Sequence, residues 1–205
     1  ANPGVKLPDK DITVVVRSDS SGTTYVFTGH LSAINEDFKN NIGQGKAPQW
    51  PTTSRIVKAP KNDGITATVK QTPGAIGYIE YGYAKLTNTP VAALENREGK
   101  YVMPGAESGS AARASGELPS GKRPDSDLPD LRAWVFDPAG EKAYPIASFT
   151  WLMFPEKQDA EKAKVARELV EYCLTTGQKS ADEMGYIPLP DNVIETVRKV
   201  SQKIQ

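Results

Sequence analysis

Apolar positions in the first quarter of the chain change their spacing at Gly22. Residues 11–19, DITVVVRSD, contain a run of β-favouring residues that is typical of a strand covered on both faces of a sheet. Beyond Gly22 the large apolar residues recur at intervals of four, three and four, which predicts one face of a helix that stops at Gly43. The residues on that face are Phe27, Leu31, Ile34 and Phe38. Residues 17–24, RSDSSGTT, are therefore predicted to form a turn between a strand and a helix.

The alternation of helices and strands continues beyond this turn. Residues 61–74, KNDGITATVKQTPG, predict a short helix capped by Asn62 or Asp63. Residues 75–84, AIGYIEYGYA, predict a strand, because aromatic residues and isoleucine favour sheets and glycines allow another backbone to approach. Residues 144–155, YPIASFTWLMFP, predict a second, strongly apolar strand. Strands that alternate with helices indicate an α/β architecture.

Two further helices are predicted in the last quarter of the chain. Residues 159–177 have a helical period and a stop at Gly177. Residues 189–204, LPDNVIETVRKVSQKI, have another, with Asp191 or Asn192 as the cap. The inward faces that we expect are Val165, Leu169, Tyr172 and Cys173 on the first helix and Val193, Val197, Val200 and Ile204 on the second.

Residues 104–130 are rich in glycine, serine, alanine and proline, and they predict a surface loop with a short helix near 108–115. Within them GELPSGKR, residues 116–123, nearly matches the phosphate-binding P-loop. However, Arg123 stands where that motif needs a magnesium-binding serine or threonine, and no strand precedes it. We therefore interpret this stretch as part of the loop.

Length and composition limit the classes of protein. A chain of 205 residues can form one domain or two small ones. Its 25 basic and 25 acidic residues balance, so we expect no nucleic-acid partner. No apolar stretch approaches the roughly 18 residues that span a bilayer. Residues 1–10 have no signal-peptide pattern, which is also what an exported protein shows after its signal has been removed.

Few residues of the chain are typical of catalysis or metal binding. Cys173 and His30 are each the only residue of their type, so we expect no internal disulfide, no metal site and no cofactor. A serine hydrolase that uses Ser20 or Ser21 is a weak alternative, because the G-x-S-x-G motif is missing and His30 follows about two helical turns later. We expect no catalytic residue and no enzyme.

The turn after the first strand combines groups that suit an oxyanion. A helix N-terminus has unpaired N–H groups and a partial positive charge. Gly22 lets an anion approach the backbone, Ser21 and Thr23 add hydroxyl donors, and Arg17 can add a forked, charged pair of hydrogen bonds. Asp19 can hold the guanidinium in place. The same residue types also make ordinary turns and helix caps, and composition alone leaves both interpretations open.

The segment ITVVVRSDSSGTTYVFTGHL closely resembles the arginine–serine–aspartate–x–serine–glycine–threonine segment of the phosphate-binding proteins of phosphate ABC transporters. The resemblance continues in GKAPQWP, NDGITATVKQTPGAIGYIEYGYA, YPIASFTWLMF and MGYIPLPDNVIETVR. It implies a type 2 periplasmic-binding-protein fold, in which two α/β lobes close over a dehydrated anion. By this resemblance Arg17 ion-pairs with phosphate, Ser21, Gly22 and Thr23 donate hydrogen bonds, and Asp19 braces Arg17.

The resemblance covers only the C-terminal part of the family's proteins, and the N-terminal part of the first lobe is missing here. It implies that residues 1–145 belong mainly to the second lobe and that residues 146–205 return to the first. The missing part carries the other phosphate ligands in the family, so we expect a further segment or a second chain to complete the site. A chain without it is expected to expose apolar surface around SFTWLMF.

The function that these inferences predict is binding without chemistry. We expect capture of inorganic phosphate in the periplasm or outside the cell, and delivery to the membrane permease of an ABC-type importer. One alternative is a binding protein for another tetrahedral oxyanion. Another is a phosphate-responsive signalling or interaction module on the same fold.

Overall fold

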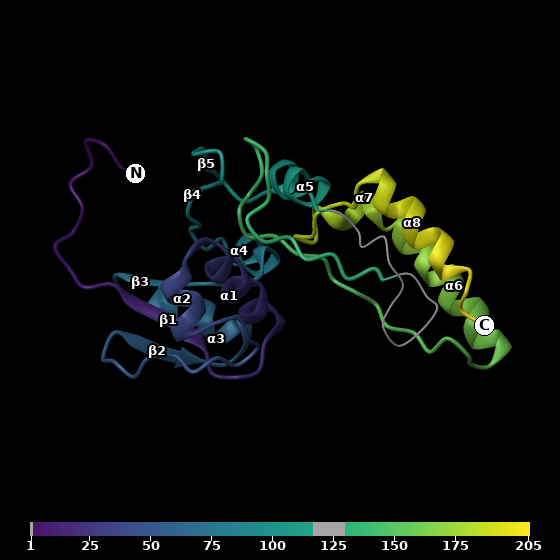
Figure 1. Ribbon diagram of the computed structural model, residues 1–205, viewed down its shortest axis with the longest axis horizontal. Coiled ribbons are helices and arrows are strands. Elements are labelled where there is room, and N and C mark those ends of the chain that lie inside the picture. Colours follow the sequence, from purple (N-terminus) through teal and green to yellow (C-terminus); the bar gives the residue numbers. More distant parts are fainter. Residues whose placement is uncertain (1, 117–129) are drawn as a thin grey trace. The chain divides into compact units, whose positions relative to one another are not determined.

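The computed structural model describes residues 2–116 and 130–205. The chain divides into two compact units, residues Ala1–Thr89 and Pro90–Gln205, and each is described by itself (Figure 1). Helices and strands alternate through the first unit, as the sequence predicts for the α/β class. The P-loop-like stretch at residues 116–123 lies, apart from Gly116, outside the described residues.

The first unit is built on a parallel sheet of three strands. They are β1 (Thr13–Arg17), β2 (Ile56–Ala59) and β3 (Ala75–Gly77), in the order β2-β1-β3. The predicted strand at 11–19 is thus the central one. Its Val15 and Val16 are fully buried, as a central strand requires.

Helix α3 (Lys61–Gln71) packs against one face of this sheet and forms the core of the unit with it. Val15 and Ile65 meet there, and a Cβ at Gly77 would lie 2.9 Å from Ile65 Cγ2. The glycine therefore permits the close approach of the helix, as the sequence predicts. The predicted cap at Asn62 or Asp63 is wrong, because the helix begins before both, with Pro60 at its N-cap position.

The long helix predicted after Gly22 is two helices, α1 (Gly22–Ile34) and α2 (Glu36–Asn41). Asn35 separates them in an extended conformation, and its side chain accepts a hydrogen bond of 2.7 Å from the amide of Phe38. Because Asn35 caps the start of α2, it ends α1, although the spacing of apolar residues continues past Asn35. The predicted stop at Gly43 is confirmed by its left-handed conformation, with φ of 72°.

The buried face of α1 also differs from the predicted apolar face. Thr24, Thr28, Gly29 and His30 are the buried residues, whereas Ile34 is 53% exposed. Thr28 satisfies its hydroxyl within the helix by donating to the carbonyl of Thr24 at 2.8 Å. Small polar residues that bond to the helix backbone can therefore pack tightly where larger apolar residues were expected.

The strand predicted over residues 75–84 ends early. Only Ala75–Gly77 is paired, and the chain then turns into helix α4 (Tyr81–Leu86), which packs against α3. Gly82 and Ala84 are buried on α4. Small side chains on a helix allow close packing, and this contact outweighs the local β preference of the aromatic residues.

The second unit contains a short antiparallel pair and four helices among its described residues. The strands are β4 (Leu94–Glu95) and β5 (Tyr101–Val102). The helices are α5 (Ala106–Ala114), α6 (Ala160–Leu174), α7 (Gln178–Ala181) and α8 (Asp191–Ser201). Helix α5 confirms the short helix predicted near 108–115. Pro190, not Asp191 or Asn192, holds the N-cap position of α8, so that predicted cap is wrong.

The apolar strand predicted over residues 144–155 is not formed. Phe136 and Ile146 make an isolated antiparallel bridge, and residues 147–155 form neither helix nor strand. A strand needs a neighbour with which to bond, and the local pattern carries no information about that neighbour. The apolar surface predicted around SFTWLMF is present, since Leu152 is 61% exposed and Met153 is 93% exposed.

The predicted inward face of α6 is wrong as well. Val165, Leu169 and Tyr172 are 61, 47 and 57% exposed. The helix packs against α8, and its buried residues are mostly smaller than those predicted. They are Ala163, Ala166, Val170 and Leu174. On α8, Val193 is buried as predicted.

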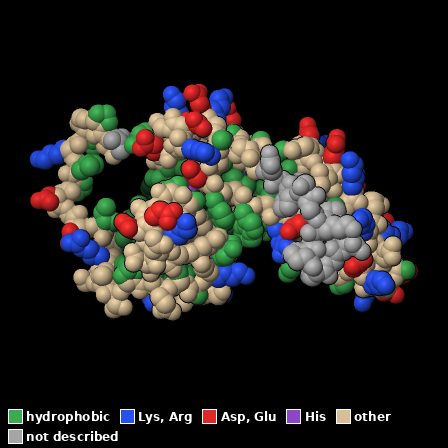
Figure 2. Space-filling model, viewed as in Figure 1, with side chains coloured by type: hydrophobic (Ala, Val, Ile, Leu, Met, Phe, Trp, Pro, Cys, Tyr) green, Lys and Arg blue, Asp and Glu red, His purple; other side chains and the backbone are tan. Residues whose placement is uncertain are grey.

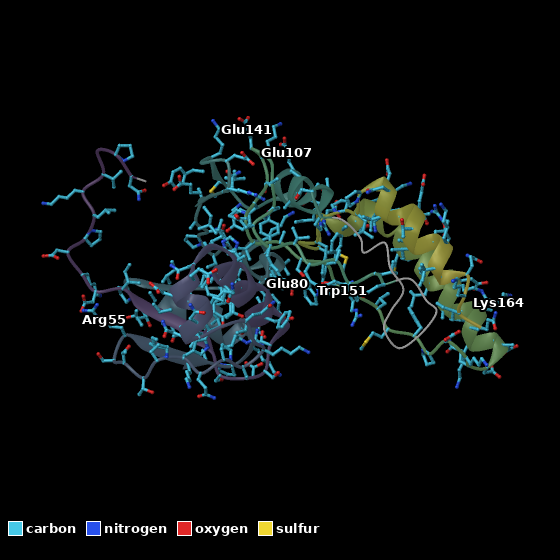
Figure 3. The ribbon with its side chains drawn as sticks, viewed as in Figure 1. Arg55, Glu80, Glu107, Glu141, Trp151 and Lys164 are labelled. Atoms are coloured by element: carbon cyan, nitrogen blue, oxygen red, sulfur yellow. The ribbon has the colours of Figure 1, made fainter. Side chains whose placement is uncertain are left out.

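Charged side chains of both signs are interspersed on the face of the molecule seen in Figure 2. Several pair locally, as Lys164 does with Glu168 on α6 and Arg55 does with Asp11 (Figure 3). Of the helices in the described part of the chain, none has the length and apolar character that a membrane span requires.

Candidate functional site

The predicted turn lies at the carboxyl edge of the parallel sheet in the first unit. β1 ends at Arg17 and β2 at Ala59, which are register partners, and the amide of Ser18 donates to the carbonyl of Ala59 at 3.0 Å. Four residues separate the end of β1 from the start of α1, and one residue separates the end of β2 from the start of α3. Ligands of open α/β sheets bind at this edge, where helix N-termini converge.

The first turn of α1 is arranged as an N-capped helix start. Ser21 is 4% exposed, has extended backbone angles, and accepts a hydrogen bond of 3.2 Å from the amide of Thr24 through its hydroxyl. The hydroxyl proton of Ser21 remains available to a ligand, because accepting a bond uses a lone pair. A Cβ at Gly22 would meet no atom within 4 Å, so packing does not require a glycine here.

Arg17 is held inside this turn rather than extended into solvent. Its side chain is 8% exposed, and it makes a forked pair with Asp19, from Nε to Oδ1 at 2.9 Å and from Nη2 to Oδ2 at 2.7 Å. Nη1 donates to Oδ1 of Asn62 at 3.1 Å. The sequence predicts the brace from Asp19, but it does not predict the contact with Asn62, which lies on α3.

The pairing of Arg17 with Asp19 shifts the pKa values of both residues in the directions expected for an ion pair. The hydrogen bonds from Arg17 are the main reason that the pKa of Asp19 lies well below its usual value, and the amide of Lys61 adds to the effect. The same pair raises the pKa of Arg17 against the opposing effect of burial. The turn therefore carries a fixed cation and a fixed carboxylate at physiological pH.

The guanidinium retains donors beyond these contacts. An arginine has five N–H groups, and three of those on Arg17 bond to Asp19 and Asn62. One N–H on Nη1 and one on Nη2 therefore have no partner among the residues that the structure describes. Two charged donors of this kind can bond to the oxygens of a tetrahedral oxyanion.

Asp19 also serves α3. Its Oδ1 accepts a hydrogen bond of 2.9 Å from the amide of Lys61, the first residue of that helix. One carboxylate thus braces Arg17 and satisfies an unpaired donor at a second helix N-terminus. The sequence-based prediction of a cap at Asn62 or Asp63 missed this, because the capping side chain lies 42 residues away.

Tyr78 is a further member of the site that sequence reasoning missed. It follows β3 directly, and its hydroxyl accepts a hydrogen bond of 3.2 Å from the amide of Arg17. The same hydroxyl lies 2.8 Å from Oγ1 of Thr24. Its ring stacks on Phe27 with centroids 4.3 Å apart and planes at 14°. Within the predicted strand at 75–84, nothing distinguished Tyr78 from its neighbours. Its place at the carboxyl edge of the sheet follows only from the end of β3 at Gly77.

The structure therefore brings all the predicted site residues to one turn, which comprises Arg17, Asp19, Ser21, Gly22 and Thr23. The hydroxyl of Thr23 makes no hydrogen bond with any residue of the described ranges, and Gly22 is exposed. The roles of these residues as phosphate ligands stay predictions. No group of three or more histidine, cysteine or carboxylate side chains in the described ranges is arranged to bind a metal ion.

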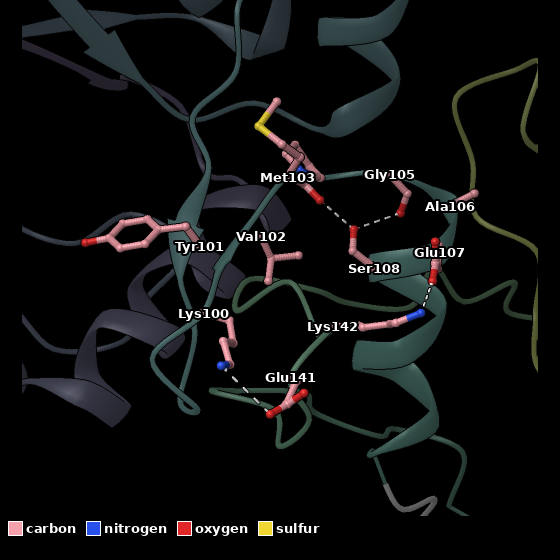
Figure 4. Close-up of a pocket in the computed structure, with 11 residues that line it drawn as sticks. Lys100, Tyr101, Val102, Met103, Gly105, Ala106, Glu107, Ser108, Glu141 and Lys142 are labelled. Carbon is pink, nitrogen blue, oxygen red and sulfur yellow. Dashed lines mark hydrogen bonds and ion pairs between the residues drawn. The ribbon is translucent and has the colours of Figure 1, made fainter. Parts of the chain in front are cut away.

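An open depression in the second unit is a weaker candidate for an anion site (Figure 4). Its cations are already paired, because Lys142 contacts Glu107 at 2.7 Å and Lys100 lies 4.0 Å from Glu141. The carboxylate of Glu107 raises the pKa of Lys142, as expected for an exposed ion pair. An incoming anion would have to displace these carboxylates.

A second buried guanidinium, that of Arg113 on α5, bonds to the backbone of another segment. It donates to the carbonyls of Ile187 and Pro188 at 2.5 and 3.0 Å, and it lies 5.5 Å from the ring centre of Phe149. Burial lowers the pKa of Arg113 to about 10. These contacts tie α5 to the segment before α8, so Arg113 is not assigned to a ligand site.

Comparison with known proteins supports the architecture. A family model described as a PBP superfamily domain matches residues 4–176. A solved structure of PfluDING, a high-affinity periplasmic phosphate-binding protein bound with phosphate, superposes with a TM-score of 0.69. That alignment covers 93% of this chain and 57% of the other at 23% identity, so it shows a shared fold.

Among curated relatives, the chain is similar to proteins named phosphate-binding protein PstS. It is 39% identical to the one from Methanocaldococcus jannaschii over 202 residues, which is 94% of this chain and 52% of the relative. It is 35% identical to the one from Xylella fastidiosa strain Temecula1, covering 96% of this chain and 52% of the relative. The Haemophilus influenzae protein is 33% identical, with 96 and 56% covered.

The chain spans about half the length of the curated relatives it matches. This confirms the predicted resemblance to phosphate-binding proteins and its restriction to part of their length. The relatives are binding proteins by name, which agrees with the prediction that the chain is not an enzyme. By its α/β fold and the match over residues 4–176, the chain belongs to the PBP superfamily.

Proposed function

We propose that the turn at residues 17–24 binds inorganic phosphate as part of an extracytoplasmic phosphate-binding protein. The observation that carries this proposal is the buried guanidinium of Arg17, which keeps two N–H donors beyond its bonds to Asp19 and Asn62. The turn that holds them leads into α1, where the amides of Gly22 and Thr23 have no hydrogen-bond partner among the described residues. Cation, amides and hydroxyls together favour a multiply charged oxyanion over a neutral ligand.

The ligand site is completed by protein outside this chain, either a further segment of the same polypeptide or a second chain. The chain spans about half the length of its relatives, which supports this part of the proposal. So does its exposed apolar surface at Met153 and along the Val165, Leu169 and Tyr172 face of α6. Surfaces of this kind are usually covered in the functional protein.

The proposed role in the cell is to capture phosphate in the periplasm or outside the cell and to deliver it to the membrane permease of an ABC importer. The names of the relatives and of the solved structure support this role. The chain would make and break no bond of the ligand. Residues 1–145 would belong mainly to the second lobe, and residues 146–205 would return to the first.

A second candidate ligand is another tetrahedral oxyanion such as sulfate. The groups of this turn that face a ligand are all donors, and the one nearby carboxylate, Asp19, is committed to Arg17 and Lys61. Donors alone bind phosphate and sulfate in the same geometry, because only an acceptor can recognise the proton of hydrogen phosphate. Selectivity would therefore come from residues that complete the site.

Calorimetric titration tests the proposal. Phosphate and sulfate would be titrated into a protein of the relatives' full length that contains this segment, and into the present chain. We expect phosphate to bind the longer protein tightly and the present chain weakly. Preferential binding of sulfate would favour the second candidate, and no binding of either anion to the longer protein would refute an oxyanion site.

A further inference from the structure

The hydroxyls of Tyr78 and Thr24 form a linked pair beside Arg17, and Tyr78 is not among the residues that the sequence predicts for the site. The pair joins three elements at one point. Tyr78 Oη accepts the amide proton of Arg17 at the end of β1, Thr24 belongs to the first turn of α1, and Tyr78 itself follows β3. We propose that this pair positions Arg17 against the α1 N-terminus and supplies one additional O–H donor to the bound oxyanion.

The additional donor follows from counting protons. Each hydroxyl carries one proton, and a single hydrogen bond of 2.8 Å links the two oxygens, whichever of them donates. The amide of Arg17 provides its own proton to Tyr78 Oη. One hydroxyl proton of the pair is therefore unused among the described residues. If Tyr78 donates to Thr24 the spare proton is on Thr24, and in the reverse case it is on Tyr78.

The location of the pair favours a ligand as the partner for this proton. Thr24 is 1% exposed, so its hydroxyl is not solvated as a surface group would be. It lies one residue beyond Thr23 in the helix turn whose amides point out of the N-terminus. Where Tyr78 is the donor of the pair, the proton of Thr24 is buried without a partner, which is costly unless a partner is present for part of the time.

The tyrosine ring is held rigidly enough to act as a spacer. It stacks on Phe27 of α1, and its ring centre lies 6.5 Å from that of Trp50. A stacked ring leaves its hydroxyl little freedom, so the distance between the end of β1 and the first turn of α1 is fixed by a stiff side chain. This arrangement keeps the backbone at Arg17 and the first turn of α1 at a constant separation, as preorganised binding requires.

This inference rests on the proposed oxyanion site, and its test uses phosphate affinity and thermal unfolding on the same variants. Tyr78→Phe keeps the stacked ring and removes only the hydroxyl. We expect phosphate affinity to fall by about fivefold, the usual effect of one hydrogen bond. Thr24→Val should lower affinity similarly, whereas Thr24→Ser should retain it because the hydroxyl remains. The double variant should lose little more than either single one, since the pair acts as a unit.

Tyr101→Phe is the matched control, because Tyr101 is 52% exposed and its hydroxyl bonds to Glu95 in the other unit. It should bind phosphate as the unmodified protein does. A purely structural role would lower the unfolding temperature of Tyr78→Phe and leave the phosphate affinity of the folded protein unchanged. That result, or additive losses in the double variant, would overturn the inference while leaving the oxyanion site intact. Failure of the unmodified protein to bind phosphate would overturn both.

Discussion

Asp19 faces Arg17 through two nearly parallel hydrogen bonds of 2.9 and 2.7 Å, although only one residue separates them in the chain. The fork compensates the charge of a guanidinium that is 8% exposed and fixes its plane. It also leaves the remaining donors of Nη1 and Nη2 free of Asp19. A cation that is already neutralised and oriented loses little freedom when an anion arrives, so this relationship underlies the proposed binding.

Replacing Arg17 with alanine should abolish most phosphate affinity. Removing one partner of a desolvated charged contact costs about 2–5 kcal/mol, which is more than tenfold in the dissociation constant. Arg17→Lys should also bind weakly, because a lysine keeps the charge but not the fork. Calorimetry with phosphate measures both. Arg55→Ala is the control, since Arg55 is in the same unit and forms an exposed pair with Asp11, and an equal loss in that variant would contradict the assignment.

Replacing Thr23 with valine should have a smaller effect. The hydroxyl of Thr23 is predicted to donate to the oxyanion, and one unmet hydrogen bond costs about 1–3 kcal/mol. Thr52→Val provides the comparison, because Thr52 is exposed in the same unit. Phosphate affinity is again the measurement. If Thr23→Val and Thr52→Val bind phosphate equally well, Thr23 is no ligand.

The contribution of Asp19 to stability should be lost only in acid. Its folded pKa is lowered by Arg17 and the amide of Lys61, so the carboxylate stabilises the native state above its unfolded pKa of about 4 and loses this effect as the pH falls toward its folded value. The unfolding temperature of the unmodified protein should therefore exceed that of Asp19→Asn near neutral pH. The difference should shrink below about pH 4, and a difference that is constant with pH would show that the charge of Asp19 is unimportant.

Two glycines of the first unit should respond differently to alanine. Gly77→Ala places a Cβ 2.9 Å from Ile65 and 3.0 Å from Val69, so we expect destabilisation of about 1–3 kcal/mol from overpacking. Gly22→Ala meets no atom within 4 Å and should leave stability nearly unchanged, but it should weaken phosphate binding by blocking approach to the helix amides. Denaturant unfolding and calorimetry separate these effects. Equal destabilisation by both variants would be inconsistent with the packing described.

The exposed apolar residues should behave differently in the short chain and in a protein of the relatives' full length. Val165→Lys and Met153→Lys replace side chains that are 61 and 93% exposed, so the present chain should keep its unfolding temperature and associate less. The longer protein should be destabilised if other residues cover these positions. Lys164→Gln serves as a control on the same helix. Unchanged stability of the longer protein would show that this surface stays uncovered.

Local sequence was sufficient to predict the first strand, the turn after it and the start of the following helix, together with the residues of that turn. A run of β-branched residues, a glycine and a serine cap act within a few positions of one another, so β1, the start of α1 and the pairing of Arg17 with Asp19 could be anticipated. The family resemblance was readable for the same reason, because it depends on short motifs. Helices α6 and α8 also follow from local periodicity, and the short helix α5 was predicted near residues 108–115.

Contacts between distant segments decided the rest. Tyr78 reaches Arg17 across 61 positions, and Asn62 reaches it across 45, so no local pattern marks either of them. The buried face of α6 depends on its contact with α8. The smaller side chains of α6 are buried, and its larger apolar side chains remain exposed to solvent. Residues 147–155 stayed unpaired because pairing requires a neighbouring strand. The spacing of apolar residues indicates which residues can be buried. The segments that bury them, or that complete a site with them, are brought together only when the chain folds, so they depend on packing between distant residues.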